Sequence, residues 1–225
     1  MTAAKVDGDF SKYPAEIREL FPYIYGELCE LRTNWEVYRE LFMADRRLTE
    51  TLSECYGSSL GILQRLLEEA LFISIGCLTD KDSKKDKHLS MWALAEKCEP
   101  WNSTVGKELK DGLVRLDDKV SRIRKHRHKR IAHFDLSTSV GLARLPIVTY
   151  KDLEETMKGL EDLLNIVDHH AIGATILFDA IITHQLTDKL EVSAYKVKVY
   201  DDLVKRGVIP LREWSKFAID RNEPL

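Results

Sequence analysis

The sequence has few of the residues that interrupt regular structure, with six prolines and eleven glycines among 225 residues. This scarcity favours long helices over a β fold with many tight turns. Gly-rich phosphate loops, H-E-x-x-H and G-x-S-x-G are absent, so nucleotide hydrolysis and serine or zinc hydrolase chemistry have no support. The four cysteines form no C-x-x-C pair and are interpreted as buried free thiols in a reducing compartment: Cys29, Cys55, Cys77 and Cys98.

Long hydrophobic runs are also missing. The N-terminus has no apolar segment of the signal-peptide kind. The most apolar run, residues 171–182, is interrupted by Asp179 and is too short to span a bilayer. Hydrophobic residues make up 44% of the chain and charged residues 32%, a balance typical of a globular protein. We therefore expect a soluble, cytoplasmic protein without a membrane partner.

What the sequence does contain is apolar residues at helical spacing along most of its length. This spacing predicts helices over residues 14–43 with a kink at Pro22, 45–78, 90–98, 103–133, 149–186 and 190–205, and a short turn or helix over 210–217. Ser103 or Thr104 is expected to cap the fourth helix. No strand pattern, Pro/Ser-rich linker or internal repeat interrupts the series. The predicted fold class is therefore all-α, a helical bundle of long antiparallel helices.

One domain is the simplest organisation for such a series. We expect a flexible N-terminal tail over residues 1–12 and a helical domain over residues 13–186. Residues 187–225 are expected to form a C-terminal helical appendage of the same domain.

The most informative segment is residues 119–134, which holds seven Lys or Arg, three His and no acidic residue. Because the net charge of the whole chain is −3, any contact with nucleic acid must be local to such a segment. Within it, Arg127 and His133 are separated by five residues, and His128 directly follows the arginine. A fixed cation beside an imidazole can bind a phosphate and move a proton next to it. RNA is therefore the first substrate to consider.

The register of the fourth predicted helix gives Arg127 an unusual place. Its apolar seam runs through Leu113, Leu116, Val120 and Ile123, and Arg127 occupies the next seam position. A charge there is costly unless it has a partner or faces a cleft or an interface. His133 lies about 240° further round an ideal helix, so only a turn at the helix end would bring it back toward the arginine. The alternative is a solvated basic helix end in which Arg127 pairs with an acid.

A metal site is not expected in this segment. His126 and His128 are two residues apart and point away from each other on a helix, and the surrounding cations repel a metal ion.

Residues 127–133, Arg-His-Lys-Arg-Ile-Ala-His, resemble the R-x4-6-H motif of the HEPN superfamily, which ends a helix of an α bundle. Residues 35–42 and 71–80 are similar to the first and second long helices of its abortive-infection branch. The blocks occur in the same order, and the resemblance covers roughly residues 14–186. It implies a HEPN-like helical fold.

The resemblance also implies a function. Many members of the superfamily are metal-independent endoribonucleases that act as toxins or antiphage effectors, and they form homodimers in which two Arg…His motifs face one cleft. The expected activity is therefore that of an endoribonuclease without a cofactor, leaving 2′,3′-cyclic phosphate and 5′-hydroxyl ends. The expected partners are RNA, a second copy of the chain, and an antitoxin or regulatory protein.

The resemblance assigns roles to single residues. His133 would act as general base or acid, Arg127 would hold the scissile phosphate, and His128 would orient or contact RNA. Further RNA-contacting candidates are Arg124, Lys125, Lys129 and Arg130, and accessory candidates are Asp80 and Asp135.

Two departures from the family pattern leave alternatives open. His128 replaces the commoner asparagine, and Asp135 stands where some relatives carry a tyrosine that a nucleotidyltransferase modifies. Parts of the superfamily have lost catalysis, so one alternative is a catalytically silent module that binds RNA or protein. Another is a structural helical protein whose basic helix end binds an acidic partner.

Overall fold

The structure is a computed structural model that describes residues 9–44, 46–81, 88–132, 144–178 and 184–208. Throughout these ranges every regular element is a helix, which confirms the predicted all-α class. The elements are α1 (Ala15–Arg18), α2 (Phe21–Arg39), η1 (Glu40–Ala44), α3 (Arg46–Tyr56), α4 (Ser58–Thr79), α5 (Met91–Cys98), α6 (Ser103–His126), η2 (Arg127–Ala132), α8 (Tyr150–Ile172) and α9 (His184–Lys205). The two η elements are π-helical turns.

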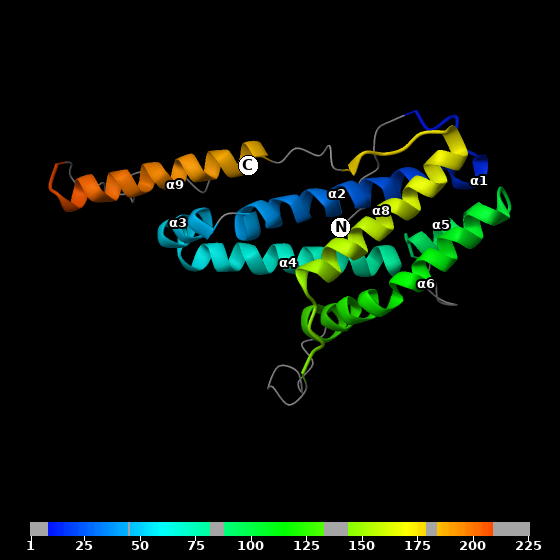
Figure 1. Ribbon diagram of the computed structural model, residues 1–225, viewed down its shortest axis with the longest axis horizontal. Helices are drawn as coiled ribbons and strands as arrows, with labels where there is room; N and C mark the ends of the chain where they lie inside the picture. Colours follow the sequence, from blue (N-terminus) through cyan, green and yellow to red (C-terminus); the bar gives the residue numbers. More distant parts are fainter. Residues whose placement is uncertain (1–8, 45, 82–87, 133–143, 179–183, 209–225) are drawn as a thin grey trace, which may run out of the picture.

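The long helices pack in antiparallel pairs. Figure 1 shows α2 and α4 side by side and running in opposite directions, with α8 crossing them obliquely and α5 and α6 at the lower right. Apolar side chains from all five helices meet in one buried cluster, as their helical spacing requires. Representative members with no exposed surface are Phe21, Leu28, Met91, Leu109, Ile123, Leu160 and Leu164.

Two glycines end helices where the sequence pattern continues. Gly57 has a φ of 52° and separates α3 from α4, whereas one helix was expected over residues 45–78. Gly173 has a φ of 71° and ends α8, which was expected to reach residue 186. Both predictions were wrong for the same reason, because a positive φ, which glycine adopts easily, stops a helix although apolar residues still follow.

Two further boundaries differ from the prediction. Pro22 lies in the first turn of α2, where its fixed φ and missing N–H suit a helix start, so it does not kink a longer helix. Asn102, rather than Ser103 or Thr104, caps α6 by accepting hydrogen bonds from the backbone N–H groups of Thr104 and Val105.

The outermost described helix, α9, packs on α3 and η1. A small second cluster of Leu41, Leu52, Leu60 and Ala194 joins these elements and the start of α4. At the other end of the described chain, Phe10 packs against the rings of Tyr13 and Phe21. The predicted domain limits stay predictions, and the short helix expected over 210–217 lies outside the described residues.

None of the helices in the described ranges is both long enough and apolar enough to cross a lipid bilayer.

Candidate functional site

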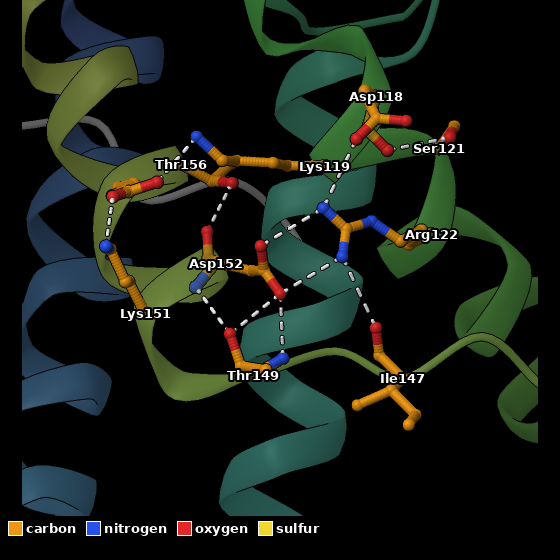
Figure 2. A network of polar contacts seen from close by, with 10 residues as sticks. Asp118, Lys119, Ser121, Arg122, Ile147, Thr149, Lys151, Asp152 and Thr156 are labelled. Carbon is orange, nitrogen blue, oxygen red and sulfur yellow. Dashed lines mark hydrogen bonds and ion pairs between the residues drawn. The ribbon is translucent and has the colours of Figure 1, made fainter.

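The helix that carries the basic segment is fixed to α8 by a closed polar network (Figure 2). Arg122 of α6 donates from Nη1 and Nη2 to the carboxylate of Asp152, at 3.3 and 3.1 Å. Asp152 also accepts from the backbone N–H and the hydroxyl of Thr149, which caps α8 in return. This network sets the direction of α6 one turn before Arg127.

His126 makes a second anchor. Its Nε2 donates to the carbonyl oxygen of Pro146 at 2.7 Å, because a carbonyl can only accept. The imidazole ring also packs edge-on against Phe72 of α4, with the centroids 5.3 Å apart. His126 is therefore a structural contact between α6, α4 and the segment that leads into α8.

The helix changes its winding at the arginine of the motif. After His126, the chain continues as the π-helical turn η2 from Arg127 to Ala132. Such turns are rare and occur frequently at functional sites. Arg127 is therefore the residue at which a regular α-helix becomes a wider turn.

The side chain of Arg127 lies across α4 and ends on a carboxylate. Its Nη1 donates to Oδ2 of Asp80 at 2.7 Å, and its Nη2 donates to Oδ1 at 3.2 Å. A Cβ atom on Gly76 would lie 2.6 Å from Nη1, so the guanidinium approaches α4 closely only because this residue is glycine. Arg127 thus occupies the seam position that the sequence predicted, with Asp80 compensating its charge.

Arg124 adds a second cation at the same end of α4. Its Nη2 donates to the carbonyl oxygen of Thr79 at 3.1 Å, and its Nε lies 3.9 Å from Oδ1 of Asp80. On its outer side it approaches Asp117 at 3.5 Å. Because the C-terminal end of a helix carries partial negative charge, cations are favourable there.

The charge states at the site follow from these contacts. Burial opposes the charge on Arg127, but the hydrogen bonds and negative charge of Asp80 outweigh it and raise the pKa of the guanidinium. The Sγ atom of Cys77 lies 3.9 Å from Nη1 of Arg127. Desolvation raises the pKa of this thiol despite the nearby cation, so the thiol remains protonated at neutral pH. Asp80 is therefore the anion that faces Arg127.

The other candidate residues divide into two groups. Lys125, His128 and Lys129 are exposed on the outer side of α6 and η2. The side chain of Arg130 and the whole of His133 and Asp135 lie outside the described residues. The structure thus brings Arg127, Arg124 and Asp80 together, while the position of His133 relative to Arg127 stays a prediction.

Gly76 and Asp117 were not identified from the sequence. Gly76 carries a usable signal, because an isolated glycine inside a strongly helical pattern often marks a close approach of another group. Asp117 carries none, because a single acidic residue on an exposed helix face is ordinary.

Two other kinds of ligand site matter for the described residues, a metal-binding group and a cavity. Among the described residues, no three His, Cys, Asp or Glu side chains form a group that could hold a metal ion. A cavity of about 530 Å³ lies along α8 and is lined by residues of this helix, by residues 175–178 and by Arg32 of α2. None of the residues that line it belongs to the basic segment.

An all-α bundle with a half-buried arginine at the end of a basic helix is the arrangement expected of a HEPN domain. The HEPN_AbiU2 family model, described as AbiU2, matches residues 14–192 of the chain. This chain therefore belongs to the AbiU2 family of abortive-infection-type HEPN domains, which confirms the resemblance found in the sequence. No curated protein and no solved structure shows significant similarity to it.

Proposed function

We propose that this protein is a metal-independent endoribonuclease that acts in abortive infection or in a toxin–antitoxin system. The observation that supports this proposal most is the placement of Arg127. Its side chain is partly buried, with an exposure of 24%, and Arg127 lies at the start of the turn that leads toward His133. A planar, permanently charged donor in a partly desolvated position suits a phosphate.

The proposed reaction uses the 2′-hydroxyl of the RNA as nucleophile. His133 removes or delivers a proton, and the 2′-oxygen attacks phosphorus while the bond to the 5′-oxygen breaks. The departing 5′-oxygen receives a proton, so the products are a 2′,3′-cyclic phosphate and a 5′-hydroxyl. Arg127 binds the non-bridging oxygens and stabilises the charge that develops on them.

The exposed cations of the basic segment would bind the flanking phosphates. Lys125 and Lys129 lie on the outer side of the helix that carries Arg127. His128, Arg124 and Arg130 complete this proposed surface. Phosphate contacts of this kind give little sequence preference and depend strongly on salt.

A second copy of the chain would complete the cleft. α4, which carries Gly76 and ends directly before Asp80, exposes Ile62, Leu66 and Ile73, at 50%, 53% and 38%. These residues are spaced so that they share one face, and an apolar face beside the site suits a homodimer. Sedimentation at micromolar concentration should show a dimer, and a strict monomer would contradict a shared cleft.

The decisive experiment compares the wild type with His133→Ala on labelled single-stranded and structured RNA in EDTA. We expect only the wild type to cleave and to leave cyclic-phosphate ends. Loss of activity in EDTA that added metal restores would contradict the metal-free mechanism. Equal cleavage by both proteins would contradict the role of His133.

The second candidate is a catalytically silent module that binds RNA or protein. The ion pair with Asp80 favours it, because the carboxylate already neutralises the guanidinium. Salt-sensitive RNA binding without cleavage by the wild type would support this module over the enzyme.

A further inference from the structure

The contact between Asp80 and Arg127 uses only one edge of the guanidinium. A guanidinium carries five N–H donors, of which the carboxylate of Asp80 accepts one from Nη1 and one from Nη2. The Nε–H group and the second N–H of Nη2 point to the adjacent side and form another two-donor fork. Among the residues that the structure describes, the Nε–H of Arg127 meets no acceptor.

The guanidinium is held in this orientation by a slot on α4. Gly76 lies in the last turn of α4, and Asp80 is the extended residue that directly follows the helix. A Cβ atom on Gly76 would lie 2.9 Å from Cδ and 2.6 Å from Nη1 of Arg127, so the glycine forms the floor of the slot. Asp80 closes its end, and Arg124 approaches the same carboxylate at 3.9 Å.

We propose that Gly76 and Asp80 are positioning residues that orient Arg127 so that its Nε and Nη2 edge faces the scissile phosphate. This inference rests on the proposed ribonuclease function. Two parallel N–H donors match two phosphate oxygens, and a guanidinium that is fixed in advance needs no reordering during the reaction. Asp80 acts through Arg127 and touches neither the RNA nor the reacting atoms.

The first test is Asp80→Asn, with Asp117→Asn as its matched control. Asp117 lies 3.5 Å from Arg124 and is 53% exposed, so the control removes the same charge from the same cluster without touching Arg127. We expect Asp80→Asn to lower kcat on the order of 10²-fold without raising KM, since misplacing a catalytic group can cost that much. Asp117→Asn should stay within about twofold of the wild type, because surface ion pairs contribute little.

The second test changes the floor of the slot and keeps the carboxylate. Gly76→Ala places a methyl group where the guanidinium lies, and we expect kcat to fall by about tenfold or more while Tm does not fall. Alanine is favoured over glycine inside a helix, so lost stability is not the expected cause. Gly61→Ala on the same helix is the control, because an added Cβ there has nothing within 4 Å.

Unchanged kcat in both Asp80→Asn and Gly76→Ala, beside an active wild type, would overturn the positioning proposal and leave the ribonuclease assignment intact. An NMR experiment distinguishes the case in which the ribonuclease function is wrong but Asp80 still orients Arg127. It follows the ¹⁵N–¹H signal of Arg127 Nε, which is assigned by its loss in Arg127→Lys. We expect this signal to move in Asp80→Asn, and to move in the wild type on adding 2′-O-methyl RNA, which lacks the nucleophile. A signal that depends on Asp80 but never responds to RNA, in a wild type that does not cleave, would contradict the ribonuclease and support the orienting contact alone.

Discussion

Two arginines five residues apart, Arg122 on α6 and Arg127 at the start of η2, pair with aspartates in the same two-point geometry, yet their surroundings differ. Arg122 donates to Asp152 and also reaches the Ile147 carbonyl oxygen and the carboxylate of Asp118, so both of its Nη atoms have two partners (Figure 2). Arg127 donates to Asp80 and leaves an edge of its guanidinium unused by the described residues.

Exposure does not distinguish the two arginines. The Arg122 side chain is 29% exposed and the Arg127 side chain 24%, so each is held at a similar depth. The difference lies in which donors a ligand can still reach. The Nε–H of Arg122 also has no partner, but it is buried, whereas the unpaired Nε–H of Arg127 is not. An arginine whose unpaired donor is buried can only stabilise the fold, whereas one with an accessible edge can also bind a ligand.

The largest expected effect comes from replacing each of the two arginines by alanine in turn. Arg127→Ala should lower kcat for RNA cleavage by roughly 10² to 10³-fold, the cost of removing one donor to a developing oxyanion. Arg122→Ala should keep kcat and lower Tm instead. The measurements are single-turnover cleavage and thermal unfolding of both variants.

Arg127→Lys sharpens the same comparison. Lysine keeps the charge but lacks the planar fork, so activity should remain poor. Equal losses of activity in Arg122→Ala and Arg127→Ala would contradict the assignment of a structural role to Arg122 and a ligand-binding role to Arg127.

A smaller effect is expected on the free energy of unfolding when the polar network of Arg122, Asp152 and Thr149 is weakened. Asp152→Asn weakens the capping box of α8 and the ion pair with Arg122. We expect a loss of about 1–2 kcal/mol at pH 7, measured by urea unfolding. Asp118→Asn is the control, because its carboxylate is 89% exposed and such changes usually stay within about 0.5 kcal/mol.

The pH dependence of stability in the wild type and in Asp152→Asn gives a further test. The backbone hydrogen bond from Thr149, with further help from its hydroxyl and from Arg122, outweighs desolvation and lowers the pKa of Asp152 below the ordinary 3.8. Because the pKa is lower in the folded state, the stabilisation is present above pH 3.8 and is lost as the pH falls through the folded value. The stability gap between wild type and Asp152→Asn should therefore shrink below this pH. A constant gap would contradict the assignment.

The smallest expected effect concerns two lysines of the basic segment. Lys125 is exposed, whereas Nζ of Lys119 lies 2.6 Å from a carboxylate oxygen of Glu155 on α8. Lys125→Gln should reduce the slope of log affinity against log salt for single-stranded RNA by about 0.7, the value of one phosphate contact. Lys119→Gln should leave the slope unchanged, and equal changes would mean that the segment binds RNA through its total charge.

The all-α class and the seam position of Arg127 were predictable because both follow from helical periodicity within one segment. The breaks at Gly57 and Gly173 were not, since apolar spacing continues past them and only a backbone angle marks the stop. The partner of Arg127 was also hidden. Asp80 lies 47 residues earlier, and the sequence suggested it only as an accessory position through the family resemblance. Pairing across that distance depends on how α4 and α6 pack, which no local pattern specifies.

The π-helical turn at Arg127–Ala132 bears on the meaning of the number of residues between the arginine and the histidine of the motif. A π turn closes its hydrogen bonds five residues apart where an α-helix closes them four apart, so it accommodates one additional residue. Deleting one residue within such a turn restores the α-helical pattern and leaves the residues on either side in register. The number of residues between an arginine and a histidine in such a motif therefore does not by itself fix the angle between their side chains around the helix axis.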